Sequence, residues 1–224
     1  MTAPRRILAV ASSAASVLAF AAPAHGATVA TTPCVLVASG IRSMAVTTTG
    51  FTPGSVVTIL TAPKGSTSPS TLTSGIADAA GSFSTTTFPP SFNPFSRNLQ
   101  TFAIAAKDSV NPALTATSSF QQVRPSYSTN PSSGKPTSKA THTVRGFTPG
   151  KNTYLHFRFG GQTKRNVKVG KASAPCGVAS KRMALLPTRS RPGTWTVYAD
   201  QKTTYSKSTS PQLKYSFVIR RTFG

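Results

Sequence analysis

A five-residue motif that occurs twice constrains the fold of this chain more than any other feature. The letters GFTPG span residues 50–54 and return at residues 146–150, 96 residues later. Proline followed by glycine suits the central positions of a type II turn, and the phenylalanine can fill the end of a β-sandwich. The spacing is also close to the length of one sandwich domain. The repeat therefore predicts two tandem sandwich domains, each with the motif at a turn between strands.

Alternation of apolar and polar residues predicts strands around both copies of the motif. After the second copy, Leu155, Phe157 and Phe159 fall on one side of the stretch, and His156 and Arg158 fall on the other. This period of two residues is typical of a half-buried strand, so we expect His156 to face solvent beside Arg158. No stretch shows a convincing helical period. Many short strands separated by Gly, Pro, Ser and Asn predict an all-β fold.

Two further stretches give the chain a resemblance to a known family. Residues 78–83 read DAAGSF after the first motif, and residues 191–197 read RPGTWTV after the second. Together with GFTPG, these stretches resemble the bacterial immunoglobulin-like repeats of exported actinobacterial proteins. The resemblance implies two immunoglobulin-like β-sandwiches that serve as spacers, adhesive modules or envelope binders. The second copy departs from the pattern because it lacks the Asp-x-x-Gly-x-Phe turn.

The domain boundaries follow from the repeat and from one polar segment. We expect domain 1 at residues 27–122 and domain 2 at residues 123–224. Residues 123–136 are rich in Pro, Ser, Asn and Gly and are the expected linker. Its early part would join the domains, and its later part would begin the second.

The first 26 residues read as a secretory signal peptide. Arg5 and Arg6 precede an uncharged run of small and apolar residues that is too short to span a bilayer as a helix. Small residues then permit cleavage after Ala24 or after Gly26, and we take residues 1–26 as the leader. The sequence therefore predicts a secreted or envelope-associated protein without a transmembrane anchor.

Positive charge is concentrated in the second half of the chain. Residues 27–122 carry four Lys or Arg against Asp78 and Asp108, whereas residues 123–224 carry 19 against Asp200 alone. Such an asymmetry suggests an anionic partner for domain 2. The alternative is that the lysines only keep the protein soluble and protect its sheet edges.

Cys34 and Cys176 are the only cysteines. A pair of cysteines in an exported protein usually forms a disulfide, and the alternatives are free thiols or a bond to another molecule. Aligning the two GFTPG motifs places Cys176 in the second domain opposite the DAAGSF turn of the first, so the bond would join the domains. By loop-closure entropy, such a long loop would stabilise the fold by about 5 kcal/mol.

The chain lacks the residues that most enzymes and metal sites need. Three aspartates and no glutamate are too few for a glycosidase pair or a calcium loop. The mature histidines, His142 and His156, have no partner at the spacing of a zinc site. No Gly-x-Ser-x-Gly elbow is present, so a hydrolase would have to combine a serine with one of these histidines and Asp200. We expect no catalytic residue, no metal and no cofactor.

The interpretation that remains is an exported, non-catalytic protein whose basic second domain binds an anionic polymer. Tyr154, Tyr198 and Tyr205 can add stacking beside the charge. The expected binding residues are Arg158, Lys164, Arg165, Lys168, Lys171, Lys181 and Arg182.

The expected partner is an anionic cell-envelope polymer or another extracellular polyanion, whose binding would weaken with salt. Export argues against genomic nucleic acid. Domain 1 would then be a spacer. Two alternatives stay open: an adhesion module that recognises another protein through its loops, and a secreted hydrolase.

Overall fold

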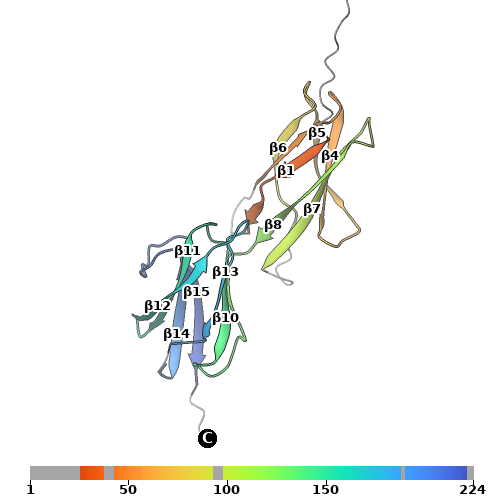
Figure 1. Cartoon of the computed structure of the whole chain (residues 1–224). Helices are drawn as coiled ribbons and strands as arrows, with labels where there is room; N and C mark the ends of the chain where they lie inside the picture. The colour runs from red at the N-terminus through yellow and green to blue at the C-terminus, as the bar shows by residue number, and fades with distance from the viewer. Residues whose placement is uncertain (1–25, 38–42, 93–97, 188–189, 221–224) are drawn as a thin grey trace, which may run out of the picture.

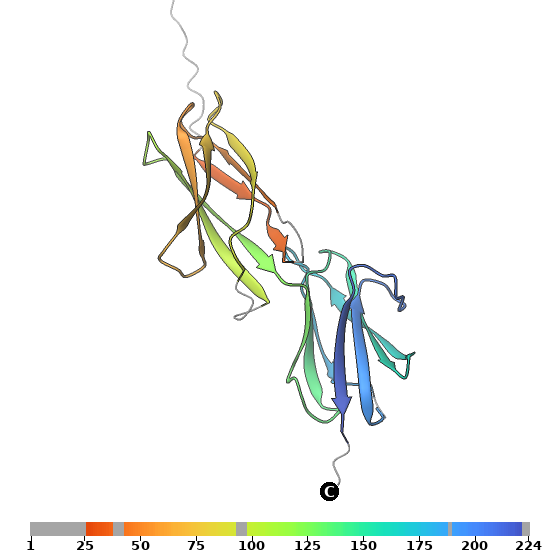
Figure 2. The same cartoon turned by 180° about the vertical axis from the view of Figure 1, so that it is seen from behind.

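The structure, a computed structural model, describes residues 26–37, 43–92, 98–187 and 190–220. The predicted signal peptide lies outside these ranges, except for Gly26. The described residues form strands and turns without a helix, so the predicted all-β fold is confirmed. In particular, they include no helix that could cross a bilayer. They build two β-sandwiches that lie end to end (Figures 1 and 2).

Domain 1 packs a sheet of three strands against a sheet of five. Strand β2 pairs with β8 in parallel, whereas all other neighbours are antiparallel. The three-stranded sheet has the order β1 (Thr28–Thr31), β3 (Met44–Thr49) and β6 (Phe83–Thr87). The five-stranded sheet has the order β2 (Cys34–Leu36), β8 (Thr115–Val123), β7 (Leu99–Asp108), β4 (Val56–Pro63) and β5 (Ser70–Ile76).

Domain 2 packs a sheet of three strands against a sheet of four, and all its pairs are antiparallel. The three-stranded sheet has the order β13 (Ala179–Ala184), β10 (Lys139–Arg145) and β9 (Ser126–Asn130). The four-stranded sheet has the order β12 (Gln162–Lys171), β11 (Asn152–Phe159), β14 (Gly193–Asp200) and β15 (Leu213–Ile219). Strands β12 and β13 are therefore edge strands of different sheets.

The connection between the sandwiches is short. Strand β8 ends at Val123 and β9 begins at Ser126, so Arg124 and Pro125 form the whole connection. The linker predicted at residues 123–136 is longer than this connection because part of it forms β9, which pairs with β10.

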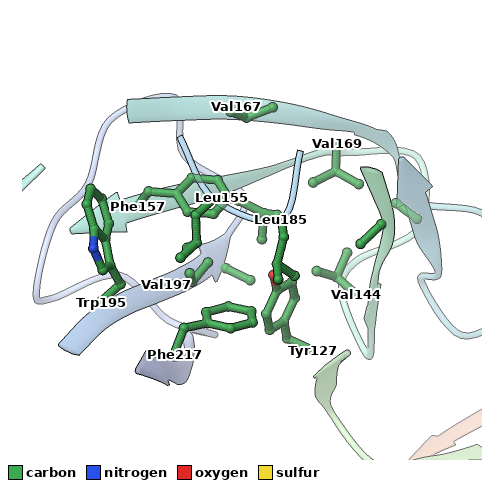
Figure 3. Close-up of a cluster of buried hydrophobic side chains, with 14 of the residues drawn as sticks. Tyr127, Val144, Leu155, Phe157, Val167, Val169, Leu185, Trp195, Val197 and Phe217 are labelled. Carbon is green, nitrogen blue, oxygen red and sulfur yellow. The ribbon is translucent and has the colours of Figure 1, made fainter. Parts of the chain in front are cut away.

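Each domain has its own apolar core, supplied by the inward residues of both sheets. In domain 1, Val46 of the smaller sheet and Phe102 of the larger sheet belong to one buried cluster. In domain 2, Leu155 and Phe157 are buried as predicted, and Phe159 packs at the margin of the core. Figure 3 shows the cluster of domain 2, with side chains that converge between the two sheets. Burial of these alternating residues is the main stabilising term of each sandwich.

The two GFTPG motifs form the predicted type II turns. The residue after each motif donates its N–H to the carbonyl of the motif's threonine, at 3.0 Å in the first copy and 3.4 Å in the second. Gly54 and Gly150 have φ of +77° and +83°, which a type II turn requires at its third position. Phe51 and Phe147 are each 3% exposed, so they fill their cores as predicted.

A second glycine in each domain holds the motif in place. Gly81 and Gly177 also lie 96 residues apart. Their carbonyl oxygens accept the N–H groups of Phe51 and Phe147, at 3.0 and 3.3 Å. A Cβ atom on Gly177 would overlap the carbonyl oxygen of Phe147, and its φ is +62°. The second domain therefore keeps the critical glycine although it lacks the residues around it.

A disulfide joins the two sandwiches. Cys34 of β2 is bonded to Cys176 between β12 and β13, with a Cα–Cα distance of 5.3 Å. The predicted pairing is confirmed. Cys34 lies opposite Gln121 near the end of β8. The chain and the disulfide therefore both cross the joint between the domains.

Candidate anion-binding surface

The edge strands β12 and β13 lie side by side along one edge of domain 2. Lys181 links them, because its ammonium group donates a hydrogen bond to the carbonyl oxygen of Lys168 at 2.8 Å. A backbone carbonyl at the edge of one sheet is thus satisfied by a side chain from the other sheet.

Six of the seven predicted binding residues lie on these two strands, and all six are exposed. The four on β12 extend over about 23 Å, given the rise of a strand. We call the six residues the basic edge: Lys164, Arg165, Lys168, Lys171, Lys181 and Arg182.

No carboxylate neutralises the basic edge within the described part of the chain. The only contact found there between a carboxylate and a Lys, Arg or His side chain joins Asp200 and His156, and both side chains are fully buried. Lys164 donates to the amide oxygen of Gln162 at 2.6 Å, and Lys181 donates to a carbonyl, so these contacts are to neutral groups. The positive charge of the edge therefore stays available to an external anion.

The side chains of the basic edge point in more than one direction. Lys168 lies between the buried residues Val167 and Val169, so it projects from the outer face of the four-stranded sheet. Arg182 alternates with Met183, which packs on the core, and therefore projects from the outer face of the three-stranded sheet. The positive charge wraps around the edge of the sandwich rather than covering one flat face.

The opposite edge of domain 2 has a lower density of charge. It is formed by β9, which has no basic residue, and by β15, whose only lysine is Lys214. The two edges share the same architecture but not the same charge.

Arg158, the seventh predicted residue, lies on β11, the strand next to β12, and its cross-strand neighbour there is Thr163. Its guanidinium carbon lies 3.9 Å from the centroid of the Tyr205 ring, and its Nη2 donates to the carbonyl of Gly161. Its Nε is buried without a hydrogen-bond partner among the described residues. The side chain is thus engaged in packing the outer face of the four-stranded sheet.

The prediction that His156 faces solvent is wrong. Its side chain does project from the outer face of the sheet, but it is fully buried. Nδ1 lies 2.7 Å from Oδ1 of Asn166, and Nε2 lies 3.0 Å from Oδ1 of Asp200. A strand pattern reports which face a residue occupies, not whether another segment covers that face.

The segment that covers His156 is residues 201–212, which we call the covering loop. The N–H of Lys202 donates to Oδ1 of Asp200 at 2.8 Å, and the amide of Gln212 donates to Oδ2 at 3.1 Å. The ring of Tyr205 packs edge-on against His156, with centroids 6.0 Å apart. Asp200 therefore anchors both ends of the loop that excludes water from the histidine.

His142 is also buried, with both ring nitrogens occupied. Its Nε2 lies 3.1 Å from the carbonyl oxygen of Ala184, and its Nδ1 lies 2.7 Å from the hydroxyl of Tyr127. Burial lowers the pKa of His142, and the hydrogen bond to Ala184 opposes this only in part. The carbonyl can only accept, so the neutral ring carries its proton on Nε2. Neither described histidine has a nitrogen left for a serine hydroxyl.

No described group of three His, Cys, Asp or Glu side chains has the arrangement of a metal site.

Comparisons with known proteins do not assign a family. No protein-family model matches the chain, and no curated protein matches it. Among solved structures, it is similar to a tetra-tandem repeat in the extending region of a large adhesion protein, with 15% identity over 86% of this chain and a TM-score of 0.27. The chain spans 49% of that structure. It is also similar to the YadV chaperone, with 12% identity, coverage of 87% of this chain and 100% of that one, and a TM-score of 0.29.

Two further basic residues of the three-stranded sheet were not among the predicted set. Lys139 and Arg145 lie on β10 and alternate with the buried residues Ala140, His142 and Val144. They therefore share the outer face of the three-stranded sheet with Arg182. The alternation of exposed and buried positions along this stretch could have identified both residues as facing outward.

Two of the three tyrosines that we expected to stack on the ligand instead contact other side chains of the protein. Tyr198 and Tyr205 have ring centroids 4.8 Å apart, and Tyr205 also lies under Arg158. Tyr154 lies on the same outer face, opposite Lys168 of the basic edge.

Proposed function

We propose that the protein is exported and non-catalytic, and that the basic edge of domain 2 binds an anionic polymer of the cell envelope or its surroundings. The observation that carries this proposal is the set of six exposed cations on two adjacent edge strands, without a carboxylate beside them in the described residues. Domain 1, with a nearly balanced charge, acts as a spacer.

A polymer suits this surface better than a small anion. The cations are spread over about 23 Å along β12, and they also extend around the edge to β13. A small anion would contact one or two of them, whereas a chain with repeated phosphate or carboxylate groups contacts several at once. Release of counterions from the polymer then drives the association.

The disulfide supports an oxidising location. A bond between Cys34 and Cys176 persists outside the cytosol, where thiols are not kept reduced. It agrees with the predicted leader at residues 1–26, in which Arg5 and Arg6 precede an uncharged run. The anionic partner is therefore an extracellular or envelope polymer rather than genomic nucleic acid.

The histidine geometry supports a non-catalytic role. A Ser-His-Asp site needs a histidine that can receive a proton from a serine hydroxyl. His142 and His156 are buried, and each has both nitrogens within hydrogen-bond distance of another group. This arrangement favours a binding function over a hydrolase.

The test is binding of the purified protein to heparin and to inorganic polyphosphate across a salt series. We expect binding at low salt that weakens steeply as salt rises. Charge reversal at Lys164, Arg165, Lys168 and Lys171 should weaken binding at least about tenfold and flatten the salt dependence.

A control variant keeps the total charge change but moves it elsewhere. It reverses Lys64, Lys107, Lys207 and Lys214, which are all exposed and lie off the basic edge. This variant should retain most of the affinity. Absent binding at low salt, binding indifferent to salt, or an equal loss in both variants would each refute the proposal.

A further inference from the structure

Tyr154 differs from the other tyrosines of this protein. The hydroxyl of Tyr127 contacts His142, the rings of Tyr198 and Tyr205 contact each other, and the ring of Tyr215 packs against Tyr127. Among the described residues, Tyr154 has neither a ring contact nor a hydrogen bond from its hydroxyl. Its ring and hydroxyl are thus free to serve an external ligand.

The position of Tyr154 places this ring beside the basic edge. Tyr154 lies on β11 between the fully buried residues Thr153 and Leu155, and therefore on the outer face of the sheet. Its cross-strand neighbour on β12 is Lys168. Directly paired side chains on one face of a sheet have their Cβ atoms about 5 Å apart. Lys168 is exposed, and its ammonium group has no partner among the described residues.

These two side chains offer complementary chemistry at one place. A half-buried aromatic ring presents an apolar surface on which the flat apolar face of a sugar ring can pack, and its hydroxyl can exchange hydrogen bonds with sugar hydroxyls. The neighbouring ammonium group binds an anionic substituent by a charge-assisted hydrogen bond. A polymer of bare phosphate uses only the lysine, whereas an anionic polysaccharide uses both.

We infer that Tyr154 and Lys168 form a subsite for one sugar unit of an anionic glycopolymer, whose phosphate or carboxylate group binds Lys168. This inference rests on the proposed function, and it specifies the class of polymer. The remaining cations of the basic edge bind neighbouring units of the same chain.

The experiment compares two probes on the intact protein: polygalacturonate, which carries carboxylates on sugar rings, and inorganic polyphosphate, which has no sugar. The main variant is Tyr154→Thr, because a β-branched residue suits an exposed strand position. We expect it to weaken polygalacturonate binding at least about fivefold and to change polyphosphate binding less than about twofold. Tyr154→Phe keeps the ring and should retain most of the affinity for polygalacturonate.

Lys168→Ala provides the matched comparison, since it should weaken the binding of both probes. Equal effects of Tyr154→Thr on the two probes, or an effect on neither, would overturn the subsite and leave the anion-binding function intact. If neither probe binds the unaltered protein in a salt-dependent way, the proposed function itself fails. The two failures are therefore distinguishable.

Discussion

His156 and Asp200 form a buried pair on the outer face of the four-stranded sheet, with Nε2 3.0 Å from Oδ1. In domain 1, Asp108 lies at the end of β7, the strand that corresponds to β14, and its Oδ2 accepts the N–H of Thr52 in the GFTPG turn at 2.8 Å. In domain 2, Gln201 accepts the N–H of Thr148 in the second turn, at 3.2 Å. In domain 2, Gln201 therefore accepts the hydrogen bond from the turn that Asp108 accepts in domain 1. The carboxylate of Asp200 instead contacts His156.

Loss of the Asp200 carboxylate should destabilise domain 2. We expect Asp200→Ala to lower the free energy of unfolding by about 3 kcal/mol, because it leaves His156 and the amide of Gln212 without their acceptor. Denaturant unfolding followed by the fluorescence of Trp195, the only tryptophan, reports on this domain. Lys202→Ala, at an exposed position of the covering loop, is the control. A loss in Asp200→Ala no larger than in the control would contradict this role.

Substitution of Gly177 should be far more damaging than substitution of Gly150. Both have a positive φ, so alanine at either position costs about 1–2 kcal/mol of backbone strain. A Cβ at Gly150 meets open space, whereas one at Gly177 overlaps the carbonyl of Phe147. We therefore expect Gly177→Ala to lower the free energy of unfolding by at least about 3 kcal/mol. Equal denaturation midpoints for the two variants would show that the overlap with the carbonyl oxygen of Phe147 adds no loss of stability.

Sequence reasoning succeeded where the structural cause is local. The turn at residues 50–54 needs a proline and a glycine at fixed positions, and both are visible in the sequence. Gly177 was missed because the residues around it differ from those around Gly81, although the spacing of 96 residues was available as a signal.

The prediction for His156 failed for a different reason. Its face of the strand was predicted correctly, but its burial depends on a loop that begins 45 residues later and folds back across the sheet. No local pattern encodes that contact. The basic edge shows the intermediate case. The sequence placed Lys181 and Arg182 in one predicted set with the cations of β12, but the contact between the two edge strands appears only in the tertiary structure.

The stability of domain 2 should decrease as the pH falls below about 6.5, in part because of His142. Burial lowers the pKa of this histidine below its ordinary value of 6.5. Burial also raises the pKa of Tyr127, so its phenol stays a proton donor to the ring. Between the ordinary pKa and the lowered one, the unfolded chain binds more protons than the folded chain. The free energy of unfolding therefore falls on acidification, by up to about 1.4 kcal/mol per pH unit.

The measurement is the free energy of unfolding at several pH values between about 7.5 and 5. His142→Gln removes the titrating group and keeps a side chain that can both donate and accept hydrogen bonds. We expect a shallower pH dependence in this variant. Parallel curves for the two proteins would rule out His142 as a source of acid sensitivity.

The disulfide should determine how the protein carries mechanical load. A tension applied between the two ends of the described chain enters near Thr28, reaches Cys34 in β2 and passes directly to Cys176. The tension therefore does not pass along the chain between the two cysteines, which are 142 residues apart in the sequence. Most of domain 1 and the first half of domain 2 lie within this loop, so they cannot be extended while the bond is intact.

Single-molecule extension of the full chain tests this consequence. Under oxidising conditions, we expect unfolding to release only the residues outside the loop. A Cys34→Ser/Cys176→Ser variant, or the unaltered protein in reductant, should extend by roughly 480 Å more, because each freed residue contributes at most about 3.4 Å. The variant should be insensitive to reductant, which controls for other effects of the reagent. The same final extension in oxidised and reduced protein would mean that the load does not pass through the disulfide.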